Sequence, residues 1–424
     1  MANARKIALN ALCDVRSGGA YSNITLNKYF SENDLSATDK SLSTALFYGV
    51  LDRTITLDFV LSQYIKTSLK KVQPLALEIL REALYQIMYM DKIPDSAAVN
   101  EAVKLIKNSK HKHLSGFVNG VLRSILREGI KLPNISDSKS LSVIYSCPEW
   151  IIKSFIADYG FENTTQLLEY SLHTPPVTLR VNKLKTNVTD LTEILLKENI
   201  SVCSTKVENA LEIVGGIDVT KSAAYLNGLF HVQDISSQTV VSVLAPQPNE
   251  NVLDICAAPG GKTFTMAQYM KNNGKITACD LYEKRVELIQ KGANRLGITN
   301  IKVMQNDATA INNTFENFDA ILCDVPCSGL GVIRRKPEIK YKDITEYKDI
   351  TLIQSKILEN SAKYLKQNGR ILYSTCTLRK CENEDIIQRF LDKHPQYELK
   401  YQRTFMPHID GSDGFYCALL QKSR

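Results

Sequence analysis

The carboxyl-terminal part of the chain alternates short apolar runs with longer amphipathic stretches, and this pattern constrains the fold more than any other feature. From about residue 234 onward, the runs typical of β-strands are 252–255, 275–278, 301–304, 320–322 and 371–373. Stretches with helical spacing separate them, near 263–271, 283–296 and 351–366. Because strands that alternate with helices pair in parallel and are covered on both faces, the pattern predicts a doubly wound, Rossmann-like α/β domain over 233–424.

The amino-terminal part has the helical spacing of an all-α bundle, which we expect over residues 1–130. The segment 131–147 is polar and rich in helix breakers, so we expect a linker there. Residues 148–232 mix strand-like runs with helical stretches, which predicts a small α+β module. A chain of 424 residues is too long for one ordinary core, in agreement with this multidomain organisation.

The composition is that of a soluble globular protein, with 44% hydrophobic and 23% charged residues. No apolar stretch approaches the length of a membrane span, and the first residues lack a secretory signal, so we expect a cytoplasmic protein. None of the ten cysteines has Cys-x-x-Cys spacing, so we expect neither a disulfide framework nor a metal site.

The positive charge is concentrated near the amino terminus. Residues 1–140 contain 19 Lys and Arg against 13 Asp and Glu, within a chain whose net charge is +7. A solvated helix face is one explanation, but a sustained excess of one sign also indicates a polyanionic partner, and nucleic acid is the first candidate.

Two cysteines follow strand-like runs directly. Cys327 lies in Asp-Val-Pro-Cys-Ser-Gly, which begins at Asp324, and Cys376 lies in Ser-Thr-Cys-Thr. Ligands of open α/β sheets bind at the carboxyl ends of strands. Packing in a core is the usual fate of a single free cysteine. The two contexts together favour a reaction centre.

A glycine-rich turn and a series of acids predict a cofactor site at the same edge. The first strand of this domain leads into Cys256–Thr263 and then a helix, so the glycines admit a ligand to the backbone and the helix start offers free N–H groups. Asp280, Asp307 and Asp324 follow the next three strands. Each acid alone could be a helix cap, but the set suits a ribose. The phosphate-loop and dinucleotide glycine patterns are absent from the sequence, which favours S-adenosylmethionine.

The runs Asp254–Lys262, Asp324–Gly329 and Ser374–Thr377 resemble those of RNA (cytosine-5) methyltransferases. The amino-terminal bundle, with Phe-Val-Asn-Gly-Val-Leu-Arg at 117–123, resembles the NusB antitermination domain, and this fusion is typical of the RsmB (Sun) family. One departure is Arg334–Tyr341, where relatives usually have Asn-Pro-Asp or His-Pro-Asp and a final Trp.

The resemblance implies a class I methyltransferase that methylates C5 of a cytosine in 16S rRNA, position 967 in the family. It implies that Cys376 is the nucleophile that bonds to C6, that Cys327 assists product release, and that Asp324 lies between cofactor and base. Lys262 is a candidate positive neighbour of the thiolate, and the alternatives are a cofactor contact or a solvated helix start. The implied cofactor residues are Cys256, Ala257, Ala258, Pro259, Gly260, Gly261, Lys262, Asp280, Asp307 and Asp324. Arg285 is a further candidate for the ribose edge, and a surface arginine is the equal alternative.

We expect RNA contacts from Arg180, Asn182, Arg334, Arg335 and Lys340. The target base must leave its stack to meet both thiol and methyl group. The expected partner is 16S rRNA, free or in a partly assembled small subunit, and we expect a monomer. Two alternatives stay open: an antitermination-like RNA-binding factor with an inactive methyltransferase domain, and the same chemistry on another RNA.

Overall fold

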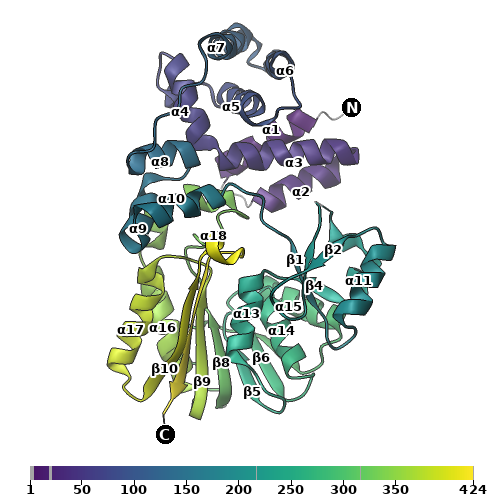
Figure 1. Ribbon diagram of the computed structural model, residues 1–424, viewed down its shortest axis with the longest axis vertical. Coiled ribbons are helices and arrows are strands. Elements are labelled where there is room, and N and C mark those ends of the chain that lie inside the picture. The colour runs from purple at the N-terminus through teal and green to yellow at the C-terminus, as the bar shows by residue number, and fades with distance from the viewer. Residues whose placement is uncertain (1–3, 19–21, 216, 316, 424) are drawn as a thin grey trace. The chain divides into compact units, whose positions relative to one another are not determined.

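The computed structural model describes residues 4–18, 22–215, 217–315 and 317–423 (Figure 1). The chain forms two compact units, the first made of Met1–Leu172 with Lys336–Lys342 and the second of His173–Arg335 with Asp343–Arg424. Within the described ranges, every helix is too short or too polar to span a bilayer.

The first unit is entirely helical, as the amino-terminal pattern predicts. Ser36 caps its third helix by accepting a hydrogen bond from the Asp39 N–H, and Pro74 is the first residue of another helix. Leu12, Leu46 and Leu80 are fully buried at the centre of the bundle. Its α-helices are α1 Ala4–Gly18, α2 Ser22–Glu32, α3 Ala37–Asp52, α4 Thr54–Tyr64, α5 Pro74–Tyr89, α6 Asp95–Lys107, α7 Ser115–Glu128, α8 Ser138–Tyr145, α9 Glu149–Tyr159 and α10 Phe161–Tyr170.

The predicted linker at 131–147 contains a helix, α8, so that prediction is wrong for Ser138–Tyr145. Asp137 caps α8 in a capping box, and the side chain of Leu141 is fully buried. The Thr56 hydroxyl of α4 donates to the carbonyl of Val143 at 2.5 Å. Helices α9 and α10 also belong to the first unit, although the sequence pattern assigned them to the small module.

The small module of the second unit is an antiparallel sheet in the order β2-β3-β1-β4, covered by a helix. Leu191 and Leu195 of that helix pack with Phe230 of the sheet. Its elements are β1 Thr178–Val181, α11 Val188–Lys197, β2 Val202–Ser204, β3 Ala210–Ile213, α12 Ala223–Leu226 and β4 Phe230–Val232.

The seven-stranded sheet has the order β10-β11-β9-β8-β5-β6-β7. The predicted strands, β5 to β9, are parallel, and the strand order reverses between β5 and β8. Two strands that the sequence pattern did not predict, β10 and β11, extend the edge in antiparallel pairing. The strands are β5 Asn251–Asp254, β6 Lys275–Asp280, β7 Ile301–Gln305, β8 Phe318–Asp324, β9 Leu365–Thr375, β10 Tyr397–Phe405 and β11 Phe415–Lys422.

Helices cover both faces of this sheet (Figure 1). One face packs on α13 Ile235–Leu244, α14 Gly261–Tyr269 and α15 Glu283–Leu296, and the other on α16 Ile350–Lys363 and α17 Glu384–Lys393. Successive residues of a strand point to opposite faces, so Val252 packs under the first set and Leu253 under the second. The loops at the carboxyl ends of the strands are therefore held on a rigid, doubly covered sheet.

Candidate active site

The carboxyl ends of β8 and β9 meet at a charged cluster. Asp324 and Ser374 are register partners, and the Ser374 hydroxyl donates to Asp324 Oδ1 at 2.8 Å. From the start of α14, Lys262 Nζ donates to Asp324 Oδ2 at 2.8 Å. Burial alone lowers the pKa of Lys262, but the Asp324 carboxylate and the neighbouring Cys376 raise it above its ordinary value. The ammonium group therefore stays charged beside Cys376.

The two predicted thiols are in contact. Cys327 Sγ lies 3.2 Å from Cys376 Sγ. The hydrogen bond with Cys376, followed by burial, raises the pKa of Cys327 well above its ordinary value. Cys327 thus stays protonated and can donate to its partner. A hydrogen-bond donor and a positive charge are the two kinds of neighbour that stabilise a thiolate, and Cys376 has both.

A buried carboxylate that the sequence analysis missed fixes the two thiol loops relative to each other. Glu382 is fully buried and accepts a hydrogen bond from the backbone N–H of Ser328 at 2.9 Å. The Ser328 hydroxyl is 2.8 Å from that of Thr377. Ser328 follows Cys327 and Thr377 follows Cys376, so these contacts join the two loops directly beside the thiols.

A close approach of backbone atoms supports the Cys376 loop from the other side. The Gly331 N–H donates to the Cys376 carbonyl at 3.0 Å, and the Gly414 N–H donates to the Gly331 carbonyl at 2.9 Å. A Cβ on Gly331 would lie 2.0 Å from the Gly414 oxygen. Only glycine at 331 permits this packing.

The predicted cofactor loop follows β5 and leads into α14. Gly260 has φ +110°, and a Cβ there would lie 2.3 Å from the Phe264 ring, so both conformation and space require glycine. Gly261 begins α14, where backbone N–H groups have no partner within the helix. Burial raises the pKa of the Cys256 thiol well above its ordinary value, which fits a packing residue and not a nucleophile.

Asp280 and Arg285 meet at the end of β6. Arg285 Nη1 is 3.3 Å from Asp280 Oδ1, and Nη2 donates to the Ala258 carbonyl at 3.1 Å. Asp307, in contrast, accepts hydrogen bonds from the hydroxyl and N–H of Thr309, which lower its pKa, so it caps its own exposed turn. The structure therefore joins Arg285 and Asp280 to the loop, whereas Asp307 Oδ1 contacts Thr309 of its own turn.

Asp254 is not among the site residues predicted from the sequence. It ends β5, and its Oδ2 accepts a hydrogen bond from the Thr263 hydroxyl at 2.6 Å. Its Oδ1 is buried and has no hydrogen-bond partner among the described residues. Burial raises the pKa of Asp254 to about 7. An unused carboxyl oxygen beside the glycine-rich loop is an acceptor available to a ligand.

Known proteins match this chain over its whole length. The family models that match are 16S rRNA methyltransferase RsmB/F at residues 241–421, NusB family at 2–127, and Methyltr_RsmF/B-like, ferredoxin-like domain at 147–220. The chain is 40% identical over 441 residues to the probable ribosomal RNA small subunit methyltransferase B of Bacillus subtilis (strain 168), with 99% of this chain and 98% of that protein covered. The chain belongs to the ribosomal RNA small subunit methyltransferase B family.

Other relatives agree with this assignment. The ribosomal RNA small subunit methyltransferase B of Shewanella oneidensis is 32% identical, with 99% of each chain covered. The crystal structure of PH0851 has a TM-score of 0.84 and 27% identity, covering 100% of this chain and 99% of that one. A methyltransferase homolog from Pyrococcus horikoshii has a TM-score of 0.61 and 28% identity, covering 68% and 100%. The predicted family and fold class are confirmed, and the protein is a methyltransferase.

Two residues of the small module that were predicted to contact RNA, Arg180 and Asn182, are buried, which contradicts direct contact. Arg180 is 3% exposed and donates to the Glu208 carbonyl at 2.9 Å. Asn182 is fully buried and donates to the carbonyls of Gly228 and Leu296, each at 2.8 Å. These side chains hold the small module against the sheet domain.

Lys340 is also internal, since it is 2% exposed and donates to the Asp52 carboxylate at 2.6 Å within the first unit. Burial contradicts its predicted phosphate contact. Arg334 is nearly buried, with Nη2 3.7 Å from Asp413 Oδ1, and Arg335 pairs with the same carboxylate. Burial of Arg334 does not fit its predicted phosphate contact. Arg335 keeps 27% of its side chain exposed, so its phosphate contact stays a prediction.

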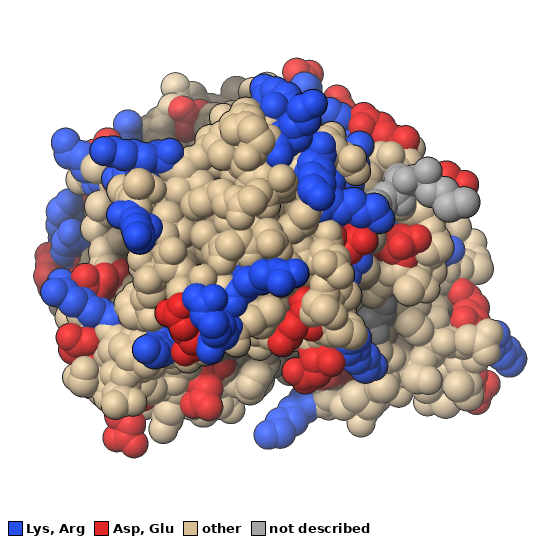
Figure 2. Space-filling model, turned by 90° about the horizontal axis from the view of Figure 1, so that it is seen from above, with Lys and Arg blue, Asp and Glu red and all other residues tan. Residues whose placement is uncertain are grey.

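Basic side chains do lie on the surface elsewhere. Seen from above, Lys and Arg gather in short groups around a broad uncharged area (Figure 2). Residues 102–127 of the first unit include no Asp or Glu. The exposed basic residues of this stretch are Lys104, Lys107, Lys110, Lys112, Arg123 and Arg127. These residues are better candidates for phosphate contacts than the five predicted ones, because their side chains are accessible.

Proposed function

We propose that the protein transfers a methyl group from S-adenosylmethionine to C5 of a cytosine in small-subunit ribosomal RNA, with Cys376 as the covalent nucleophile. The target that the family implies is cytosine 967 of 16S rRNA. The observation that carries the proposal is the contact between Cys327 and Cys376 beside the charged Lys262–Asp324 pair. These groups lie at the carboxyl ends of the strands next to the point where the strand order reverses, which is where α/β sheets bind ligands.

The loop after β5 has the features that S-adenosylmethionine requires. Bare backbone at Gly260, the helix start at Gly261 and the carboxylate of Asp280 suit an amino acid and a ribose better than a phosphate. The free oxygen of Asp254 adds an acceptor. When bound, the cofactor supplies an electrophilic methyl group on a positively charged sulfur. The proposed contacts are Cys256 to Lys262, Asp280, Arg285, Asp307 and Asp324.

The covalent step follows from the chemistry of cytosine. C5 is a poor nucleophile, and addition of the Cys376 sulfur to C6 makes it enamine-like and able to accept a methyl group. Cys327 as a thiol donor and Lys262 as a cation favour the Cys376 anion before attack. Asp324 accepts hydrogen bonds at both oxygens, which is the behaviour of a carboxylate. We therefore assign it to accepting from the cytosine amino group.

Product release needs two further events. Once Cys376 is bonded to C6, Cys327 loses its thiol proton to solvent, and its sulfur then takes the C5 proton. The electrons of that C–H bond re-form the C5–C6 double bond as the C6–sulfur bond breaks. The departing Cys376 sulfur then takes a proton or stays anionic. Cys327 is the nearest group to this sulfur, at 3.2 Å, so we assign the release step to it.

Bisulfite mapping tests the proposal in cells that lack the protein and receive wild type, Cys376→Ala or Cys203→Ala. Cys203 is an exposed cysteine of the small module and serves as the matched control. We expect one small-subunit cytosine to lose its mark and only wild type and Cys203→Ala to restore it. Restoration by Cys376→Ala refutes the nucleophile, and unchanged ribosomal RNA in the deletion strain refutes the substrate.

A further inference from the structure

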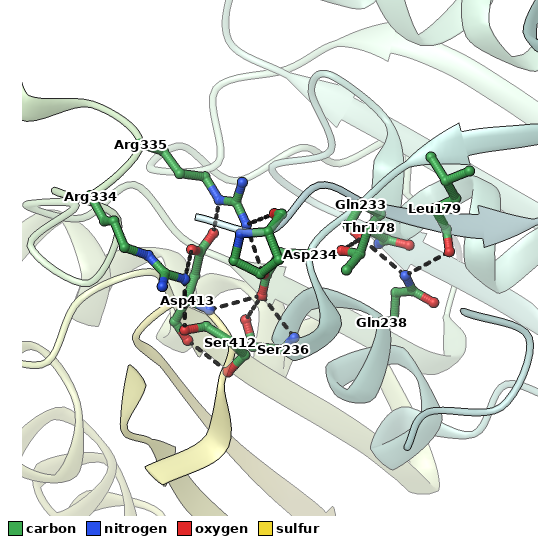
Figure 3. A network of polar contacts seen from close by, with 11 residues as sticks. Thr178, Leu179, Gln233, Asp234, Ser236, Gln238, Arg334, Arg335, Ser412 and Asp413 are labelled. Atoms are coloured by element: carbon green, nitrogen blue, oxygen red, sulfur yellow. Dashed lines mark hydrogen bonds and ion pairs between the residues drawn. The ribbon is translucent and has the colours of Figure 1, made fainter. Parts of the chain in front are cut away.

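A network of ion pairs in the second unit joins segments that are far apart in the sequence (Figure 3). Arg335 Nε donates to Asp413 Oδ2 at 2.6 Å. Its Nη2 donates to Asp234 Oδ2 and to the Pro176 carbonyl, each at 3.0 Å. One guanidinium thus connects the loop after Cys327 with the start of β1, the start of α13 and the turn before β11.

Arg335 is a cation that the two carboxylates share. Asp234 caps α13 through its Oδ1, which accepts from the Ser236 N–H at 2.8 Å and from the Asp413 N–H at 3.2 Å. Burial and the Asp234 carboxylate raise the pKa of Asp413, and the charge of Arg335 opposes that rise. Without the guanidinium, the two largely buried acids would keep one hydrogen bond between them and the longer Arg334–Asp413 ion pair at 3.7 Å. The attachment of the turn at 413 to α13 would then be weaker.

That turn is directly connected to the nucleophile. Next to Asp413, the Gly414 N–H donates to the Gly331 carbonyl, and the Gly331 N–H donates to the Cys376 carbonyl at 3.0 Å. Arg335 itself ends the same loop, where its N–H donates to the Val332 carbonyl at 2.9 Å. The path from the guanidinium to Cys376 therefore consists of one ion pair and two backbone hydrogen bonds.

We propose that Arg335 is a positioning residue for Cys376: by fixing Asp413 against Asp234 it holds the Gly414–Gly331–Cys376 backbone contacts in register. The proposal rests on the proposed function in taking Cys376 as the nucleophile, and it gives Arg335 a role other than phosphate binding. Its contacts use two nitrogens of a planar fork on three acceptors, a geometry that the single nitrogen of lysine does not reproduce.

The test compares Arg335→Gln and Arg335→Lys with Arg403→Gln in the full chain. Arg403 also forms an arginine–aspartate pair, with Asp410 at 2.5 Å, but it is half-exposed and lies outside the backbone path. The measurements are kcat and KM for methyl transfer to small-subunit RNA and the rate of Cys376 alkylation by iodoacetamide, followed by mass spectrometry. Alkylation of the exposed Cys203 is the internal reference.

We expect both Arg335 variants to lose about 100-fold in kcat with KM nearly unchanged, since a displacement near 1 Å costs about that much. Cys376 alkylation slows in both, while Arg403→Gln and the Cys203 reference behave as wild type. Wild-type kcat and alkylation in a folded Arg335 variant overturn the proposal. A rise in KM alone also overturns it, because that result indicates a phosphate contact.

A milder variant and a separate measurement keep the test decisive. Asp413→Asn retains an acceptor for Arg335 but loses the charge, so we expect a smaller loss of kcat, and no loss refutes the proposed path. If wild type transfers no methyl group, the proposed function fails. The alkylation rates of Cys376 still decide whether Arg335 positions it.

Discussion

Replacement of Gly331 by alanine tests the geometry of the nucleophile loop most simply. The added Cβ would lie 2.0 Å from the Gly414 oxygen and 2.9 Å from the Cys376 oxygen, where ordinary contact begins near 3.4 Å. The backbone must therefore open by about 1.4 Å. Because the obstructing atoms are backbone atoms, no side-chain rotation relieves the contact.

Opening this contact breaks or stretches the two hydrogen bonds that join Gly414, Gly331 and Cys376. At about 0.5–1.5 kcal/mol each, their loss lowers the free energy of unfolding by about 1–3 kcal/mol. A 1 Å misplacement of a reacting group costs about 100-fold in rate. We therefore expect Gly331→Ala to fold with reduced stability and to lose about 100-fold in kcat.

The assay is single-turnover methyl transfer to small-subunit RNA, with urea unfolding measured in parallel. Gly120→Ala in α7 is the control, because a Cβ there has nothing within 4 Å and alanine favours a helix by about 0.5–1 kcal/mol. Wild-type kcat in Gly331→Ala would show that Cys376 tolerates movement of its support, and this would refute the reasoning.

Lys262→Met removes the cation beside Cys376, so we expect iodoacetamide to alkylate Cys376 more slowly at pH 7. The pH dependence of the alkylation rate should move to higher pH. An unchanged pH dependence contradicts the role of Lys262. Burial lowers the pKa of His231 to about 3 from its ordinary 6.5. Between pH 6.5 and pH 3, His231 binds a proton only in the unfolded chain. The contribution of His231 to the free energy of unfolding therefore decreases as the pH is lowered through 6.5, by about 2 kcal/mol at pH 5. His231→Gln should remove this part of the acid sensitivity in urea unfolding at pH 7 and 5, and equal sensitivity in the variant contradicts the assignment. Asp52 pairs with Lys340 at 2.6 Å and with Arg53 at 3.7 Å. Lys340→Met removes the closer cation and should cost about 1–3 kcal/mol in the same assay, whereas no change would show that the pair is neutral.

The sequence predicts the parallel strands and their helices because each carries its own apolar signal. Strand β10 escaped prediction because it is an edge strand whose interior residues are mostly exposed and polar, so its apolar content is low. Helix α8 escaped because its start lies in a polar segment that resembles a linker, although Asp137 in that segment is a helix cap.

The positions of Asp324, Cys327 and Cys376 at strand ends were predictable for the same local reason. Glu382 and the Gly331–Gly414 contact were not, because their roles depend on distances between segments that the chain does not place together. The ion-pair partners of the basic residues were not predictable, because the sequence shows a charge without its partner. Asp413 lies 78 residues from Arg335, and Asp52 lies 288 residues from Lys340.

The most direct test of the central claim is mass spectrometry of the covalent RNA–protein adduct formed by Cys327→Ala with S-adenosylmethionine and small-subunit RNA. If Cys376 attacks C6 and Cys327 serves release, the adduct accumulates, maps to the peptide that contains Cys376, and disappears in the Cys327→Ala/Cys376→Ala double variant. An adduct of undiminished yield in the double variant would contradict the account.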